Sequence, residues 1–197
     1  MRQGADRSAL KERRDDLYET PACATLALMR VEPLPHRIWE PAAGRGAISR
    51  ELEAAGRHVM KSDLVAHSGA DEGIVTPVDF LLELRSSLLA DAEAIVTKSP
   101  YKNADEFIRR GLFHFRLPVV VLLRLMAMEG ANRSDLVDRH LVRVWAGIER
   151  LQKFQREGWK GPKQTSETSP FAWFVFSPED RGANPIALRR MSWRVSS

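Results

Sequence analysis

The chain has 197 residues, of which 44% are hydrophobic and 28% charged, as is ordinary for a globular protein with one core. No apolar run reaches the roughly 20 residues of a membrane span, and the charged first residues lack the apolar stretch of a signal peptide. Cys23 is the only cysteine, which excludes an internal disulfide and makes the cytoplasm the expected compartment. The five histidines show no metal-ligand spacing, so no metal site is expected.

The net charge of +4 is unevenly distributed along the chain. Residues 139–197 contain eleven Lys and Arg against five Asp and Glu, a net charge of +6, whereas residues 1–138 carry −2. A basic C-terminal third fits an anionic partner such as nucleic acid. A solvated basic face without a partner is the alternative.

Helical and strand patterns alternate along the chain, which predicts an α/β fold in which helices cover a mostly parallel sheet. Residues 1–16 are expected to form a flexible arm, and residues 17–197 a single domain. Thr20 is expected to cap a helix that begins at Pro21 and runs to about Met29. Further helices are expected over residues 47–55 (ended by Gly56), 81–89 and 104–111, with a short one capped by Ser134. Seven strands are expected at residues 37–39, 58–62, 94–97, 118–125, 141–145, 171–176 and 188–193. Residues 65–77 are expected to form a loop, residues 78–80 end the third unit, and the last two strands are expected to pair as an antiparallel hairpin.

Three successive strand ends carry residues suited to a nucleoside ligand. Gly44 and Gly46 lie in a turn between a strand and a helix, where glycine lets the backbone approach a ligand closely. Asp63 follows the next strand and is placed to accept hydrogen bonds from ribose hydroxyls. Asp79 and Phe80 end the third unit, where a carboxylate and a ring can contact a purine. Each feature alone is weak, but their succession predicts a nucleoside-cofactor site.

These segments resemble the motifs of adenine-specific DNA methyltransferases, small Rossmann-like enzymes of class I that use S-adenosylmethionine (SAM). Over residues 17–193 the motifs follow the order of the gamma arrangement, and residues 156–163 and 171–175 are similar to small phage- and prophage-encoded members. The resemblance implies that the SAM-binding residues are Tyr18, Thr20, Pro21, Glu40, Pro41, Ala42, Ala43, Gly44, Gly46, Asp63, Leu64, Asp79 and Phe80. It places Lys98, Ser99, Pro100 and Tyr101 in the catalytic loop, which in the family reads Asn/Asp-Pro-Pro-Tyr/Phe.

The catalytic loop departs from the family pattern at its first two positions. Lys98 replaces an acceptor of the substrate's amino hydrogens, and an ammonium group only donates. Ser99 replaces the first proline, while Pro100 and Tyr101 are retained. Three interpretations stay open: Ser99 or backbone carbonyls act alone, the substrate is not an adenine amine, or catalysis is weak or lost and leaves a protein that binds SAM or nucleic acid.

The predicted function is methyl transfer from SAM to an adenine amino nitrogen, in DNA rather than RNA. An enzyme acting on a small molecule or protein is a further alternative. The polar segment 155–170, with Arg156, Lys160 and Lys163, is the expected phosphate-contacting loop, which Arg181, Arg189, Arg190 and Arg194 could extend. Because the chain has no room for a separate recognition domain, sequence preference is expected to be relaxed or supplied by a partner or second subunit.

Overall fold

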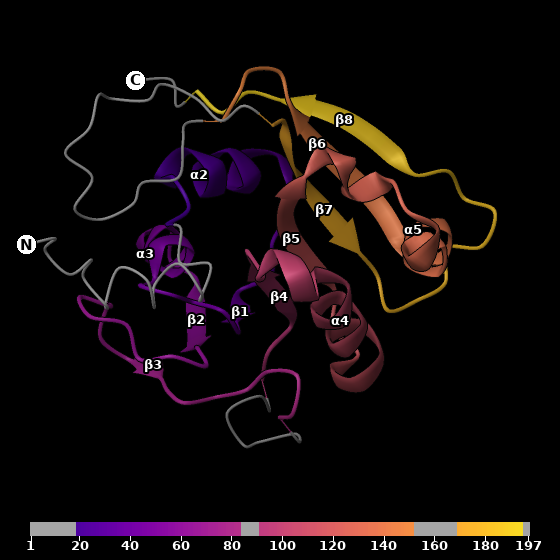
Figure 1. Ribbon diagram of the computed structural model, residues 1–197. Coiled ribbons are helices and arrows are strands. Elements are labelled where there is room, and N and C mark those ends of the chain that lie inside the picture. The colour runs from indigo at the N-terminus through magenta and orange to yellow at the C-terminus, as the bar shows by residue number, and fades with distance from the viewer. Residues whose placement is uncertain (1–18, 84–90, 152–168, 195–197) are drawn as a thin grey trace, which may run out of the picture.

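The computed structural model describes residues 19–83, 91–151 and 169–194. Eight strands in these ranges form one sheet in the order β3-β2-β1-β4-β5-β7-β6-β8 (Figure 1). The strands are β1 (Arg37–Glu40), β2 (His58–Ser62), β3 (Ile74–Val75), β4 (Ala94–Thr97), β5 (Val119–Arg124), β6 (Leu141–Gly147), β7 (Phe171–Phe176) and β8 (Ala187–Met191).

The first five strands run parallel, and the chain reverses its direction of travel across the sheet between β1 and β4. β1 pairs with both β2 and β4, so that successive units are laid down on one side of β1 and then on the other. β7 is antiparallel to both β5 and β6, while β8 lies parallel to β6 at the sheet edge. The point where the strand order reverses is where open α/β sheets bind ligands.

Helices cover both faces of the sheet and enclose two apolar cores. The α-helices in the described part of the chain are α2 (Ala22–Val31), α3 (Ala47–Ala54), α4 (Ala104–Arg109) and α5 (Ser134–Arg139). Four single-turn elements accompany them: 3₁₀ turns at Tyr101–Asn103, Leu125–Met128 and Ala131–Arg133, and a π-helical turn at Arg110–Phe115. One core lies between the sheet and α2 and α3, and the other between the sheet and α4 and α5.

The central strands are apolar on both sides because both sides are covered. β4 is buried at all four of its positions, and β5 at all but Arg124. Successive residues Ile95 and Val96 accordingly belong to opposite cores, as the alternation of side chains along a strand requires. On the α2 side, the indole of Trp173 in β7 donates a 2.9 Å hydrogen bond to the carbonyl of Ala24, which fastens α2 to the sheet.

The strand predictions differ from the structure at two places. The described ranges contain eight strands and not seven, because β3 lies inside residues 65–77, which were expected to be loop. The pair Ile74–Val75 is too short for a periodicity to show. The expected hairpin of the last two strands is also wrong, because β6 lies between β7 and β8 in the sheet. The antiparallel pairs are instead those that β7 makes with β5 and β6.

Two predicted helix caps are wrong and one helix is extended. Thr20 is not the cap of α2, because α2 begins at Ala22 and Pro21 holds the N-cap position with an extended backbone (ψ 136°). The carbonyl of Pro21 accepts a hydrogen bond from Ala24 N–H. Ser134 is the first residue of α5, and its hydroxyl donates to the carbonyl of Ala131. The helix expected over residues 104–111 continues as the π-helical turn to Phe115. Most of the helix expected at residues 81–89 lies outside the described residues.

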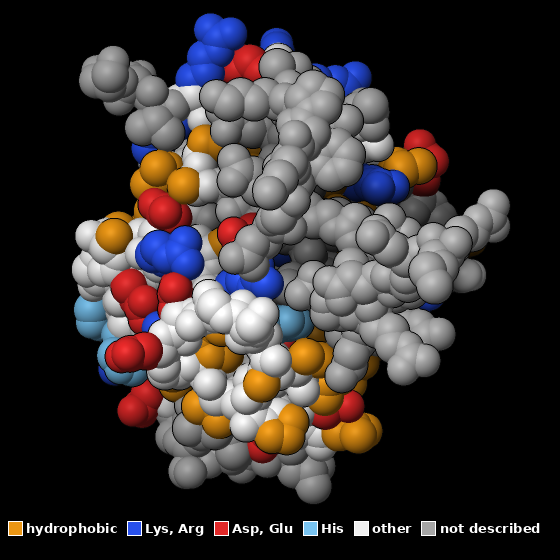
Figure 2. All heavy atoms as spheres, turned by 60° about the vertical axis from the view of Figure 1, so that its left-hand side comes forward, with side chains coloured by type: hydrophobic (Ala, Val, Ile, Leu, Met, Phe, Trp, Pro, Cys, Tyr) orange, Lys and Arg blue, Asp and Glu red, His pale blue; other side chains and the backbone are white. Residues whose placement is uncertain are grey.

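Within the described ranges, no helix combines the length and apolar character that crossing a membrane requires. The same ranges contain no group of three or more His, Cys, Asp or Glu side chains arranged to hold a metal ion. On the face shown in Figure 2, acidic and basic side chains lie next to one another, and hydrophobic side chains gather in its lower part.

Candidate functional site

A cavity of about 570 Å³ opens beyond the carboxyl ends of β1, β2 and β4, at the point where the strand order reverses. Its walls come from five segments that are separated in the sequence. They are residues 19–20, residues 40–48 after β1, residues 63–67 after β2, residues 78–81 after β3, and residues 98–107 after β4. The ends of four consecutive strands therefore contribute residues to one site.

The loop after β1 is shaped by two glycines with left-handed backbone conformations. Gly44 has φ +58°, and Gly46, at the N-cap of α3, has φ +88°. A Cβ added at Gly46 would lie 2.5 Å from Oδ2 of Asp71, so both backbone conformation and space require glycine there. The Asp71 carboxylate is held by both Nε and Nη2 of Arg50, at 3.1 and 2.9 Å. The Asp71 carboxylate, held by Arg50, thus packs against the glycine loop at Gly46.

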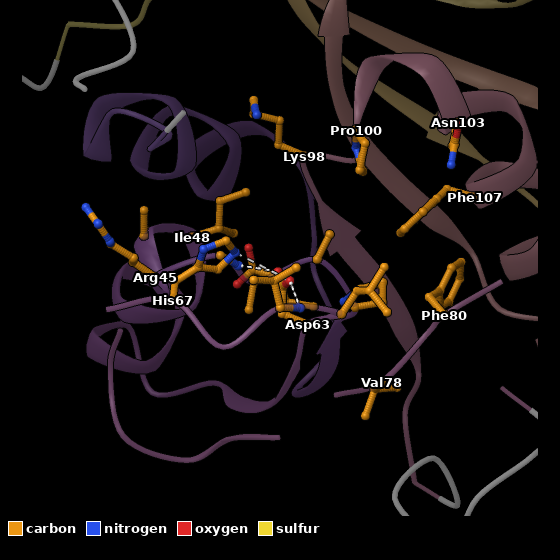
Figure 3. Close-up of a pocket in the computed structure, with 18 of the residues that line it drawn as sticks. Arg45, Ile48, Asp63, His67, Val78, Phe80, Lys98, Pro100, Asn103 and Phe107 are labelled. Carbon is orange, nitrogen blue, oxygen red and sulfur yellow. Dashed lines mark hydrogen bonds and ion pairs between the residues drawn. The ribbon is translucent and has the colours of Figure 1, made fainter. Parts of the chain in front are cut away.

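Asp63 joins the loop after β1 to the end of β2. Its Oδ2 accepts a 2.7 Å hydrogen bond from Gly44 N–H, and its Oδ1 accepts a 2.9 Å bond from Val65 N–H. Nε2 of His67 lies 3.6 Å from Oδ1. The Asp63 backbone is also fixed, because its N–H donates to Val75 and its carbonyl accepts from Val78 N–H. Figure 3 shows Asp63 at the middle of the cavity with His67 beside it.

Glu40, the last residue of β1, places a buried carboxyl group at the cavity. Its Oε2 accepts hydrogen bonds from both the N–H (2.9 Å) and the hydroxyl of Ser49 in α3. Burial raises the pKa of Glu40 from its usual 4.5 to about 8, and the hydrogen bonds from Ser49 oppose that rise. The carboxyl is therefore mostly protonated at neutral pH in the ligand-free protein. Oε1 has no hydrogen-bond partner among the described residues.

An aromatic wall stands on the opposite side of the cavity from His67 (Figure 3). Phe80 stacks on Phe107 of α4 with ring centroids 4.6 Å apart, and it meets Trp39 in an edge-to-face arrangement with ring centroids 5.0 Å apart. Next to it, Oδ1 of Asp79 accepts a 3.0 Å bond from Leu81 N–H. The ring of Phe80 is 2% exposed, so it contributes a packed apolar surface and no mobile side chain.

The segment after β4 divides between cavity and core. Lys98 and Pro100 line the cavity, whereas Ser99 and Tyr101 do not. Ser99 is fully buried, and no hydrogen-bond partner for its Oγ is found among the described residues. The Tyr101 ring packs against the core on the α2 side, with Lys98 Nζ 5.4 Å and Arg124 Cζ 5.0 Å from its centroid.

The structure brings together most of the residues that the sequence assigned to cofactor and catalysis. Those that line the cavity are Thr20, Glu40, Pro41, Ala42, Ala43, Gly44, Asp63, Leu64, Asp79, Phe80, Lys98 and Pro100. Pro21 and Gly46 shape neighbouring backbone without lining it. Tyr18 and the expected phosphate contacts Arg156, Lys160 and Lys163 lie outside the described residues.

Several lining residues were not found by sequence reasoning. His67, Asn103 and Phe107 contribute side chains to the cavity, but none belongs to a motif. His67 was considered only as a metal ligand, although its spacing of four residues from Asp63 could have indicated a contact. Arg45 and Lys102 also line the cavity; Arg45 was read only as part of the glycine motif. Asn103 and Phe107 are four residues apart, a spacing that places side chains on one face of a helix. Only this helical spacing, and not composition, could have indicated them.

Comparison with solved structures identifies the architecture. A Listeria monocytogenes protein assigned to the class I SAM-dependent methyltransferases matches with a TM-score of 0.57 and 12% identity, over 94% of this chain and 71% of that one. A Pyrococcus horikoshii protein assigned as an RNA methyltransferase matches with a TM-score of 0.55 and 13% identity, over 82% and 87% of the two chains. The chain has the class I methyltransferase fold. No sequence model of a protein family and no curated protein sequence matches it.

A third match, an O-methyltransferase of Thermotoga maritima, has a TM-score of 0.50 at 14% identity and covers 85% of this chain and 70% of that one. The proteins that share the methyltransferase fold are thus assigned different substrates. Fold similarity at this level of sequence identity does not identify the substrate. The substrate must be argued from the side chains of the cavity.

Proposed function

We propose that the protein is a SAM-dependent methyltransferase that methylates an amino nitrogen of adenine in nucleic acid, in DNA before RNA. The observation that carries the proposal is the placement of Asp63. Its carboxylate is fixed against Gly44 in the middle of a cavity at the reversal point of the sheet. A carboxylate after the second strand, beside a glycine turn, is suited to the hydroxyl groups of a ribose.

The residues around Asp63 fit the remaining parts of SAM. A cavity of about 570 Å³ falls in the range of about 300–1,000 Å³ that is typical of small-molecule sites. Asp79 and the packed ring of Phe80 offer an acceptor and an apolar surface to an adenine. Glu40, which also lines the cavity, would receive the positively charged methionine group of SAM, and that charge would favour the ionised form of its carboxyl group.

When bound, SAM supplies a methyl group on a positively charged sulfur. The protein's residues contribute position and preorganised dipoles. Asp63 and Asp79 fix the nucleoside, and the glycine loop holds Asp63 in place through Gly44 N–H. In the transfer, the amine lone pair forms the N–C bond, the S–C bond breaks with its electrons left on sulfur, and one amine proton passes to water.

Nucleic acid is the proposed substrate because basic side chains line the cavity and are frequent in the C-terminal third of the chain. Lys98 and Lys102 line it at the end of β4, and the C-terminal third of the chain is basic. One structural neighbour is also assigned as an RNA methyltransferase. If lysines contact phosphates, oligonucleotide binding must weaken steeply with added salt.

Incubation with tritiated SAM and unmethylated DNA, RNA or a protein extract tests the proposal. We expect label in the DNA fraction, at N6 of adenine after hydrolysis to nucleosides. Label confined to RNA would correct the polymer, and label in protein would overturn a nucleic-acid substrate. A flat salt dependence of oligonucleotide binding would do the same.

A second function, cofactor binding without turnover, is favoured by one feature of the segment after β4. Lys98 cannot accept a hydrogen bond from an amine, and Ser99 does not reach the cavity. Calorimetric binding of SAM, together with absence of label in every fraction, would establish this function in place of the first.

A further inference from the structure

The side chains directly after β4 leave the substrate amine without an acceptor. Lys98 carries only donors, and its Nζ lies over the Tyr101 ring at 5.4 Å. Ser99 is fully buried and does not line the cavity, and Pro100 has no polar side chain. An exocyclic amine delocalises its lone pair into the ring, so a hydrogen-bond acceptor that orients its N–H groups is needed to make it nucleophilic.

Asn103, an exposed residue three positions after Pro100, lines the cavity. The 3₁₀ turn Tyr101–Asn103 carries it there, and Asn103 N–H closes the turn by donating to the carbonyl of Pro100 at 3.1 Å. Its side chain makes no hydrogen bond with the described part of the chain. Figure 3 shows Asn103 on the same side of the cavity as Pro100 and Phe107.

The carboxyl groups of the cavity that the structure leaves available are assigned to SAM in the proposed function, Asp63 and Asp79 to its nucleoside and Glu40 to its methionine group. Both oxygens of Asp63 accept backbone N–H groups, and Oε2 of Glu40 is taken by Ser49. Among the described lining residues, Asn103 is the one carboxamide, and it can accept and donate at the same time.

Asn103 also stands beside the aromatic wall. It holds the N-cap position of α4, and Phe107 follows four residues later on the same side of the helix. Phe107 in turn stacks on Phe80. Asn103 therefore lies next to the wall that is proposed to hold the adenine of SAM, so SAM affinity is the measurement that separates a role toward the substrate base from a role toward the cofactor.

We propose that Asn103 is the residue that binds and orients the amino group of the substrate base; this assignment rests on the proposed function. Oδ1 accepts one N–H of the amine, and Nδ2 donates to the neighbouring ring nitrogen. This paired pattern matches the N6 and N7 edge of adenine. Because a carboxamide is no base at neutral pH, Asn103 orients the amine and takes no proton.

The test compares Asn103→Ala and Asn103→Asp with Asn132→Ala, an exposed asparagine outside the cavity. We expect Asn103→Ala to lower kcat by about 10²-fold, the typical effect of removing one preorganised polar group. Asn103→Asp retains an acceptor, so it should stay within about tenfold of wild type. SAM affinity measured by calorimetry should be unchanged in all three variants.

A binding measurement without turnover provides the second readout. With the demethylated cofactor present, Asn103→Ala should weaken binding of an adenine-containing oligonucleotide by about tenfold, the loss of one to two hydrogen bonds. Substituting 7-deazaadenine, which lacks N7, should weaken wild-type binding and leave Asn103→Ala unaffected. Weakened SAM binding by Asn103→Ala, or transfer that equals the Asn132→Ala control, would overturn the assignment alone. No transfer by wild type to any acceptor would overturn the proposed function, and this assignment with it.

Discussion

Replacing Gly46 with alanine tests the shape of the loop that holds Asp63. The new Cβ would lie 2.5 Å from Oδ2, 3.0 Å from Cγ and 3.1 Å from Cβ of Asp71. Asp71 must therefore move as a whole and give up its paired hydrogen bonds to Arg50. Gly56 supplies a matched control, because it has a similar φ of +78° with no atom within 4 Å of an added Cβ.

The magnitudes follow from these contacts. Both substitutions force alanine into the left-handed region, at a cost of about 1–2 kcal/mol. Gly46→Ala adds about 1–3 kcal/mol for overpacking and up to about 1 kcal/mol for the exposed Arg50–Asp71 pair. We expect a total loss of about 2–6 kcal/mol for Gly46→Ala and of about 1–2 kcal/mol for Gly56→Ala.

Urea denaturation and SAM calorimetry measure the two consequences. Gly46→Ala should lower both the free energy of unfolding and, by at least about tenfold, SAM affinity, because the loop that carries Gly44 N–H to Asp63 is displaced. Gly56→Ala should leave SAM affinity unchanged. Adding Asp71→Ala to Gly46→Ala should recover part of both losses, since it removes two of the three clashing atoms. Equal destabilisation by the two glycine substitutions, or unchanged SAM affinity in Gly46→Ala, would refute the reasoning.

Two further predictions concern the buried polar groups. The pKa of Glu40 is raised from 4.5 to about 8 by burial, so the folded state holds this proton longer than the unfolded state. The free energy of unfolding should therefore fall by on the order of 4 kcal/mol as the pH rises from about 4.5 to about 8. Glu40→Gln should make the urea midpoint nearly independent of pH over that window. A pH dependence of the urea midpoint equal to that of wild type would contradict this prediction. Trp173→Phe removes the hydrogen bond to Ala24 and part of a buried ring, and should lower the free energy of unfolding by about 2–3 kcal/mol; a loss below 1 kcal/mol would show that α2 is held otherwise.

The sequence predicts the part of the fold that strong local patterns encode. β2 and β7 match their predicted bounds, because long β-rich stretches are bounded by turn residues. β3 was missed, since two residues show no period and its pairing depends on the neighbouring β2. The pairing of β7 with β5 and β6 depends on contacts distant in sequence, which periodicity cannot indicate.

The candidate site likewise contains residues that local sequence patterns predict and residues whose role depends on the three-dimensional fold. Gly44, Asp63 and Asp79 were found because each directly follows or closes a unit of the sheet, and parallel topology gathers such positions at one edge. Asn103 and Phe107 were missed because their relevance depends on a 3₁₀ turn that reorients the chain after Pro100. Tyr101 shows the converse: its motif position suggested the site, and its packing places it against the core.

Calorimetric titration of SAM into the wild-type protein and into Asp63→Asn tests the central claim most directly, with Asp138→Asn, an exposed aspartate outside the cavity, as control. The account predicts binding by wild type and control, and a loss of about 10- to 100-fold in Asp63→Asn, the cost of hydrogen bonds to a charged group. Absence of binding heat with wild-type protein, or equal affinities in all three proteins, would contradict it.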